Sequence, residues 1–255
     1  MHLFEWEDFP WFPDVIRDAG TAYITKVMNM AGMLPPLVPK VMEAAEKSGA
    51  ERIIDLCSGA GGPALAIAAE LSERGSPLQV HCTDLFPNHV HLQFTVDASD
   101  GRVSYEPESV DATQVPEHLK GLRTIFNAFH HMTHEQARSI LADSHDKRQP
   151  IAIFEIVDRK FANLGGIWLV PFFVALVVPF MRPFNWRWIP LTYLVPIIPL
   201  FILWDGFVSC LRIYQPFELR ELVDGLDDFD WDIGLIPLPS GPIYATYLVG
   251  IPKER

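Results

Sequence analysis

The sequence predicts an α/β fold in which helices cover both faces of a doubly wound, mainly parallel sheet. Three observations lead to this prediction. From residue 51 onward, short apolar segments typical of strands alternate with helical segments. A glycine-rich turn follows the first of these apolar segments. Two further apolar segments close the chain as a pair, which indicates a terminal strand hairpin.

Local patterns place the elements in chain order. Prolines separate two short helical segments near the N-terminus, the second over residues 14–33, and a helix over 41–48 follows the break at 34–40. A helix over 63–75 closes at a glycine, and another is expected over 216–226. Strands are expected in seven segments: 52–59, 78–84, 102–110, 121–129, 150–158, 230–239 and 243–252.

Length and composition limit the class of protein. At 255 residues, of which 49% are hydrophobic, the chain suits one large α/β domain with an insertion. A net charge of −12 argues against a nucleic-acid partner and weakly against recruitment by anionic lipid headgroups.

Cysteine usage and the N-terminus concern the compartment and metals. The three cysteines, Cys57, Cys82 and Cys210, imply no disulfide framework, and a reducing cytoplasm fits best. The acidic, aromatic N-terminus lacks the features of a signal peptide. No Cys/His spacing resembles a zinc site, so no metal is expected.

The turn after the first strand is the most informative stretch. The strand ends at Asp55, Gly59 and Gly61 follow, and a helix begins with Pro63 in its first turn. Glycines allow a tight turn and close approach to a ligand, and the free N–H groups of a helix start favour a negative group. The stretch therefore predicts a nucleotide-type cofactor loop at the carboxyl edge of the sheet.

This strand and turn resemble the class I S-adenosylmethionine-dependent methyltransferases. The family's first motif, an acidic residue followed by spaced glycines, is matched by Asp55, Gly59 and Gly61, with Cys57 in place of the first glycine. Asp84, at the end of the second strand, matches the acidic residue that binds both ribose hydroxyls in that family. Nicotinamide sites have three glycines in G-x-G-x-x-G spacing, and Leu65 stands where the last should fall, so a nicotinamide-dependent reductase is disfavoured.

Softer matches extend the resemblance over residues 40–160 and 206–252. Asp111 and Ala112 match the pair that edges the adenine, and Asn127 follows strand four, where the family has its fourth motif. The resemblance implies a seven-stranded sheet, parallel except for a C-terminal antiparallel strand. It also implies S-adenosylmethionine as cofactor and S-adenosylhomocysteine as product.

The same resemblance organises the chain into three parts. They are an N-terminal helical lid (1–40), the cofactor-binding methyltransferase domain (41–163 and 206–255) and an apolar helical insertion (164–205). In this fold the connection after strand five passes over the acceptor pocket.

Three residues are candidates for the chemistry. Methyl transfer requires mainly that a nucleophile be held in line with the sulfonium methyl, and a base is needed only if the acceptor must lose a proton. His130 and His131 follow strand four, and either titrates in the right range to take such a proton; His130 is slightly preferred. Alternatively, one caps the next helix and the other lies on the surface. Glu155, in strand five, meets either a basic acceptor or an arginine such as Arg159.

Aromatic residues gather near the N-terminus, where they either form part of a lid over the cofactor or fasten the first helix to the body. They are Trp6, Phe9, Trp11, Phe12 and Tyr23.

Two apolar runs, 166–180 and 188–204, carry the remaining signal. Each reaches only the lower limit for a transmembrane helix, and several prolines interrupt them. Three readings are open: a hairpin that walls the acceptor site and docks in one leaflet, a soluble lid or dimer surface, and a two-helix span. We favour docking, with Trp186, Arg187 and Trp188 at the level of the headgroups.

The sequence thus predicts a methyltransferase that acts on a hydrophobic small molecule or lipid-like acceptor. We expect it in the cytoplasm, peripheral on the inner face of the membrane if docking holds, with no nucleic-acid partner. The alternative is a catalytically silent binding or scaffold protein docked at a membrane, because no catalytic motif such as N-P-P-Y is present.

Overall fold

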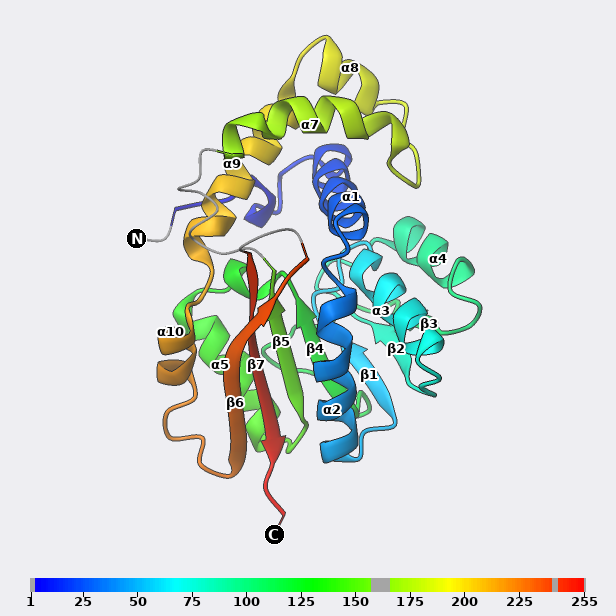
Figure 1. Cartoon of the computed structure of the whole chain (residues 1–255). Helices are drawn as coiled ribbons and strands as arrows, with labels where there is room; N and C mark the ends of the chain where they lie inside the picture. The colour runs from blue at the N-terminus through cyan, green and yellow to red at the C-terminus, as the bar shows by residue number, and fades with distance from the viewer. Residues whose placement is uncertain (1–2, 157–165, 240–242, 255) are drawn as a thin grey trace.

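A seven-stranded sheet forms the centre of the molecule, and its strand order is β3-β2-β1-β4-β5-β7-β6 (Figure 1). The computed structural model describes residues 3–156, 166–239 and 243–254. β1 to β5 pair in parallel, whereas β7 pairs antiparallel with both β5 and β6. The prediction of a doubly wound sheet, parallel except for one C-terminal antiparallel strand, is therefore confirmed.

The seven expected strand segments all contain strands. The strands are β1 (Arg52–Asp55), β2 (Gln79–Cys82), β3 (Val103–Tyr105), β4 (Leu122–Phe126), β5 (Ile151–Glu155), β6 (Phe229–Pro237) and β7 (Tyr244–Pro252). The helices that flank the sheet are α2 (Val38–Ser48), α3 (Gly62–Glu73), α4 (His89–Asp97), α5 (His134–Asp146) and α10 (Pro216–Leu222). α4 and α5 had no counterpart among the expected helices.

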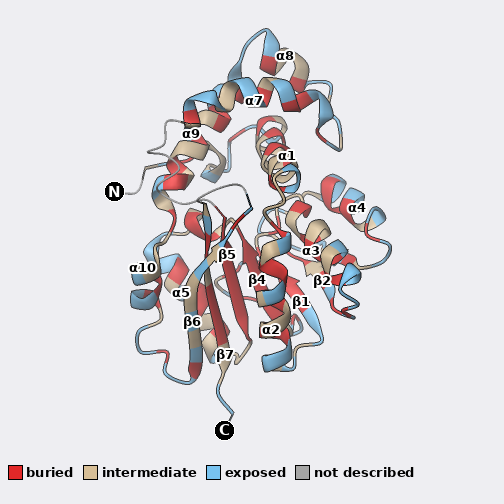
Figure 2. Cartoon of the chain, viewed as in Figure 1, coloured by how far each residue is buried: buried red, intermediate tan, exposed pale blue. Residues whose placement is uncertain are grey.

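Helices on both faces bury the central strands. Every residue of β4 and β5 is buried (Figure 2). Most are apolar, and the buried Arg123 of β4 forms an ion pair with Asp143 at 2.8 Å. One core lies on the α2 and α3 side, and a second lies on the α5 and α10 side. The two cores hold the carboxyl ends of β1, β2, β4 and β5 in one row, where side chains of the connecting loops converge.

A third core lies above this edge. It is shared by the two segments that the sequence predicts as a lid and an insertion. It contains residues of α1 (Asp14–Met30) together with residues of the insertion, as in the contact of Phe12 with Phe201, whose ring centroids are 4.9 Å apart. We call this unit, residues 3–34 and 166–212, the cap; Figure 1 shows it over one end of the sheet. The segments predicted as a separate lid and insertion thus pack as one body.

Prolines shape the insertion as short, broken helices. Its elements are η4 (Gly166–Leu169), α7 (Val170–Val177), η5 (Val178–Phe180), α8 (Trp188–Tyr193) and α9 (Ile197–Arg212). Pro171 stands in the first turn of α7 and Pro196 is the N-cap of α9, positions where a missing N–H costs little. α9 continues to Arg212, so the expected boundary at residue 205 lies inside a helix.

Among the described residues, no single helix has the length and apolar composition to cross a membrane. α9 and α10 pass that test together, but the chain bends by 67° between them. The expectation that Trp188 lies at headgroup level is wrong, because its side chain is fully buried and donates a hydrogen bond from Nε1 to the Val15 carbonyl. Trp186, by contrast, is 69% exposed.

Candidate active site

The loop between β1 and α3 adopts a left-handed backbone at three alternate residues. Cys57 has φ 57°, Gly59 φ 55° and Gly61 φ 72°. These are the three positions at which the methyltransferase motif has glycines, and here only the first carries a side chain. The conformation explains the spacing, because only glycine adopts positive φ without steric cost.

Asp55 anchors this loop from below. Its carboxylate, 1% exposed, accepts hydrogen bonds from the Ser58 hydroxyl at 2.7 Å and the Thr124 hydroxyl at 2.8 Å. Burial raises the pKa of Asp55 to about 7, although the two hydroxyls oppose that shift. The structure thus shows Asp55 tying the loop to β4, and its predicted contact with a cofactor stays a prediction.

Asp84 connects the same loop to the end of β2. One carboxylate oxygen accepts from the Gly59 N–H and the other from the Phe86 N–H, both at 2.8 Å. The side chain is partly exposed, and each carboxylate oxygen has a second lone pair. Asp84 is therefore placed and oriented to accept further hydrogen bonds from a ligand beside Gly59.

A cavity of about 340 Å³ opens next to this loop. Cys57, Val110, Asp111 and Ala112 contribute to its wall, and residues 132–139 close the other side. Ala112 is buried, whereas the exposed Asp111 carboxylate accepts from the Thr113 N–H and hydroxyl at 2.8 and 2.7 Å. Asp84 lies next to this wall, because the Val110 N–H donates to the Asp84 carbonyl at 2.9 Å, but among the described residues the cavity is lined by Asp111 and Ala112 and not by Asp84. The predicted contacts of all three with a cofactor stay predictions.

Helix α1 covers the loop from the side of the cap. A Cβ placed on Gly59 would lie 3.5 Å from Thr21, and one placed on Gly62 would lie 2.2 Å from the Thr25 hydroxyl. Asp18, on the same helix, accepts a hydrogen bond from Asn88 at 2.7 Å. The N-terminal helix therefore closes over the glycine turn, as expected of a lid.

His130 and Glu155 form a buried pair at the ends of β4 and β5. His130 Nδ1 lies 2.6 Å from Glu155 Oε2, and the other carboxylate oxygen accepts from the Phe129 N–H at 2.8 Å. Asn127, with φ 50°, accepts from the Ile156 N–H at 3.2 Å and so fixes the same corner. Glu155 thus has a partner that the sequence did not suggest. Arg159, the partner considered for it, lies outside the described residues.

His131 faces the N-terminal segment rather than solvent. Its Nδ1 lies 3.0 Å from Asp8 Oδ1 and 3.2 Å from Glu5 Oε2, and its Nε2 lies 3.4 Å from Glu7 Oε1. Burial lowers the pKa of His131, but the three carboxylates outweigh burial and raise it to about 10. The cap of the following helix α5 is Thr133, not a histidine.

The sequence gives no sign that the acidic residues of the N-terminus and Arg212 belong to this region. Arg212 donates to Asp8 at 2.7 Å and to the His131 carbonyl at 2.7 Å, and so ties the N-terminal segment to the end of β4. Asp205, on the same helix α9, accepts from the Trp6 and Glu7 N–H groups. The acidic and aromatic composition of the stretch "FEWEDF" is unusual, but its partners lie more than 120 positions away, so the sequence alone does not pair them.

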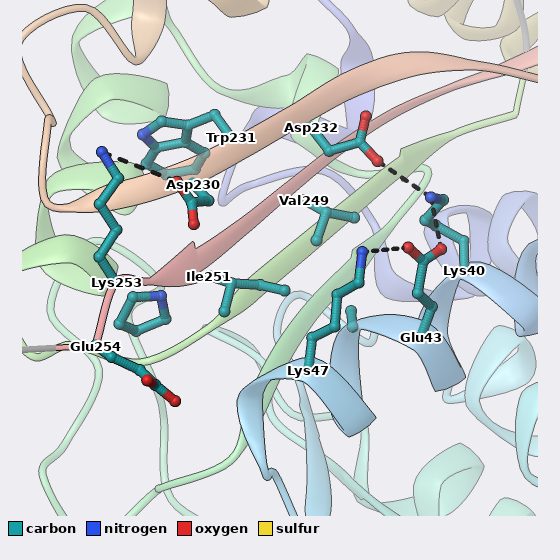
Figure 3. A pocket seen from close by; sticks show the side chains of 12 residues that line it. Lys40, Glu43, Lys47, Asp230, Trp231, Asp232, Val249, Ile251, Lys253 and Glu254 are labelled. Carbon is teal, nitrogen blue, oxygen red and sulfur yellow. Dashed lines mark hydrogen bonds and ion pairs between the residues drawn. The ribbon is translucent and has the colours of Figure 1, made fainter.

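A second cavity, of about 400 Å³, lies at the opposite end of the sheet (Figure 3). It is formed by α2, the start of β6 and the end of β7, so it faces the amino ends of the parallel strands. Its lysines are paired with neighbouring carboxylates, as in Lys40 with Glu43 at 2.7 Å and with Asp232 at 3.1 Å. Ligands of doubly wound sheets bind at the carboxyl ends, so we assign no site here.

The fold recurs among solved methyltransferase structures. The plantazolicin methyltransferase BpumL in complex with SAH matches 97% of this chain and 93% of its own, at 10% identity and TM-score 0.57. The methyltransferase domain of bacterial CtHen1 matches 87% of this chain and all of its own, at 10% identity and TM-score 0.51. The pyocyanin biosynthetic protein PhzM matches 87% of this chain at 12% identity and TM-score 0.51, and the match covers 56% of the PhzM chain.

Searches with family models and with curated protein sequences give no match. At these low identities the structural likeness concerns the fold. The chain has the fold of the class I S-adenosylmethionine-dependent methyltransferases, as its first motif predicted.

Proposed function

We propose that the protein is an S-adenosylmethionine-dependent methyltransferase with a hydrophobic small molecule or a lipid as its acceptor. The observation that carries the proposal is the contact of Asp84 with Gly59 at the carboxyl edge of a class I methyltransferase sheet. This contact holds an acidic side chain directly against the left-handed glycine turn, beside the cavity whose wall includes Cys57, Asp111 and Ala112.

The polar groups beside this cavity suit the cofactor. Asp84 would accept hydrogen bonds from the two ribose hydroxyls through its remaining lone pairs. Asp111 and Ala112 would border the adenine in the cavity of about 340 Å³. Backbone N–H groups at the start of α3 would face the negative carboxylate of the methionine part. When bound, the cofactor supplies an activated methyl group, and the protein has to hold an acceptor in line with it.

The chemistry of the cap supports an apolar acceptor. Its core is built from aliphatic and aromatic side chains of α1, α7 and α9, and it lies over the edge where β4 and β5 end. The outer surface of α7 and α8 is also apolar: Phe172 is 74% exposed and Leu194 80% exposed. Figure 2 shows exposed residues along both helices. Exposed apolar surface of this kind is typical of a docking face.

We propose that this face of α7 and α8 docks the protein on a lipid surface. Residues 166–181 carry no charge, and Arg182 and Arg187 follow at the exposed turn before α8. The net charge of −12 gives anionic lipids little to attract, so apolar contact would supply the binding. A lipid-like acceptor would reach the cap from the layer on which it rests.

The test uses S-adenosylmethionine with a radiolabelled methyl group and a total lipid extract. We expect label to enter the organic phase with the wild-type protein, and Asp84→Ala to abolish the transfer at the same cofactor concentration. Binding of S-adenosylhomocysteine without transfer to any fraction would favour the alternative, a silent binding protein on the same fold. Formation of S-adenosylhomocysteine with no label in the organic phase would keep the methyltransferase and reject the hydrophobic acceptor.

A further inference from the structure

Three side chains converge where the N-terminal segment crosses the end of β4. Glu5, His130 and His131 each present a nitrogen or oxygen atom, and these atoms lie within 4.8 Å of one another. Glu5 is fully buried, yet neither of its carboxylate oxygens makes a hydrogen bond. Its charged neighbours are Arg212 Nη1 at 3.1 Å and His131 Nδ1 at 3.2 Å. These ion pairs compensate the buried charge, but without well-aligned hydrogen bonds the carboxylate oxygens keep lone pairs for a further ligand.

The orientation of the His130 ring is typical of a histidine that binds a metal, because a carboxylate holds one ring nitrogen and the other is free. Its Nδ1 lies 2.6 Å from Glu155 Oε2, which fixes the ring and leaves Nε2 as the free nitrogen. A histidine that binds a metal almost always donates its other ring N–H to a carboxylate or carbonyl in this way. Both partners are buried, so the ring is held by packing as well.

The spacing of the converging atoms fits an ion. Two ligands of one metal at about 2.0–2.1 Å lie about 3 Å apart when they are neighbours in its coordination shell. His131 Nδ1 is 3.2 Å from Glu5 Oε2 and 3.0 Å from Asp8 Oδ1. Asp8 contacts His131, but the ligand atoms that all lie within 4.8 Å of one another belong to Glu5, His130 and His131.

The charges of the cluster also favour a cation. Glu5, Glu7, Asp8 and Asp205 come together with Glu155 nearby, and among the described residues Arg212 is the arginine or lysine that pairs with Glu5 and Asp8. A divalent ion beside two imidazoles and the Glu5 carboxylate would balance this excess of negative charge.

We infer that Glu5, His130 and His131 form a site for a divalent first-row transition ion such as Zn²⁺, Mn²⁺ or Fe²⁺. The mixed nitrogen and oxygen donors suit these ions. The inference goes beyond the proposed function and differs from the expectation of no metal, which rested on Cys/His spacing alone. The site would join the N-terminal segment of the cap to the sheet, next to the cofactor loop.

Metal binding is measured first on the intact protein without an affinity tag, freed of metal with a chelator. We expect titration calorimetry with Co²⁺ and Zn²⁺ to show one ion per chain. Glu5→Gln and His131→Gln should each weaken binding by more than about tenfold, since even outer partners of metal ligands are worth about 10- to 100-fold. His134→Gln and Glu135→Gln, exposed residues three or four positions further on, are the matched controls and should bind as wild type does.

A second measurement does not depend on how the variants fold. Electron paramagnetic resonance of Cu²⁺ bound to the wild-type protein should show superhyperfine coupling to two nitrogens. Failure of the wild-type protein to bind these ions at about 100 μM would overturn the inference. So would unchanged binding in both variants, or a Cu²⁺ spectrum without nitrogen coupling. In those cases His131 is simply a protonated partner of Glu5 and Asp8, and the methyltransferase proposal is unaffected.

Discussion

Cys57 holds a left-handed backbone that glycine would hold at lower cost. At φ 57° a residue with a side chain destabilises the folded protein by about 1–2 kcal/mol. Glycine avoids this strain but loses about 0.5–1 kcal/mol, because its unfolded state has more conformational entropy. We therefore expect Cys57→Gly to raise the free energy of unfolding by roughly 0.5–1 kcal/mol and to preserve cofactor binding. Urea unfolding measures the change. Cys57→Ala keeps the strain and removes the thiol, so a stabilised alanine variant would show that the thiol, not the backbone, is the source.

Asp84 carries the ribose contact in the proposed site. Asp84→Ala should weaken binding of S-adenosylhomocysteine by about 2–4 kcal/mol, because it removes charge-assisted hydrogen bonds to two hydroxyls and frees the Gly59 N–H. Calorimetry gives the dissociation constants. Asp97→Ala, at the exposed end of α4, is the control and should bind normally. Equal affinity in both variants would mean that the ribose lies elsewhere.

Asp55 should make stability depend on pH. Its pKa of about 7 in the folded protein exceeds the usual value of 3.8, so its contribution to the free energy of unfolding is fully present below pH 4 and is lost as pH rises through 7. The loss is of the order of 4 kcal/mol for a shift of this size. Denaturant unfolding of wild type and Asp55→Asn across that range measures it, and the wild-type advantage should shrink as pH rises. Parallel curves would show that Asp55 titrates normally.

Gly62 shows how closely two elements approach. A Cβ there would lie 2.2 Å from the Thr25 hydroxyl and 2.8 Å from Thr25 Cβ, so Gly62→Ala must push α1 away from α3. We expect a loss of about 1–3 kcal/mol in the free energy of unfolding. Gly206→Ala, inside α9 with its nearest atom at 4.0 Å, is the control and should stabilise by up to about 1 kcal/mol. Both are read from thermal or urea unfolding, and an unchanged Gly62→Ala would contradict the packing of the lid.

The exposed face of α7 is tested by charge. Phe172 and Leu176 lie one turn apart and are 74% and 66% exposed, so replacing both with glutamate should leave folding and cofactor binding intact. The wild-type protein should float with neutral liposomes in about 1 M salt, because screening does not weaken apolar contact. The double variant should not float. Phe217→Glu, at an apolar residue on α10 that is 58% exposed, controls for added charge. If the wild-type protein remains in the bottom fraction and does not float with liposomes, the cap does not dock on lipid and acts only as a lid.

The sequence predicted some elements and missed others for physical reasons. β5 is buried on both faces and begins with four apolar residues, so its sequence predicts a strand without knowledge of its neighbours. α4 was missed because its exposed face carries Val90 and Phe94, which blur the helical period. In the candidate site the motif residues are close in sequence, whereas Asp8 and His131 are 123 positions apart and only folding brings them together.

At the scale of the whole molecule, the cap and the sheet enclose one edge. The N-terminal segment and the insertion share a core. Removing residues 166–202 would therefore also remove the residues on which α1 packs, and α1 is the helix that covers Gly59. Such a deletion is therefore expected to disturb cofactor binding as well as docking. Point substitutions on exposed faces separate docking from cofactor binding more sharply.

The central claim is that the edge between the glycine turn and Asp84 binds the cofactor of a methyltransferase. Calorimetric titration of the intact protein with S-adenosylhomocysteine tests it most directly. The account predicts one molecule bound per chain with a dissociation constant in the micromolar range, competed by S-adenosylmethionine. No binding up to about 1 mM would contradict it, because that affinity is worth only about 4 kcal/mol and falls short of what the contacts of Asp84 and the loop should supply.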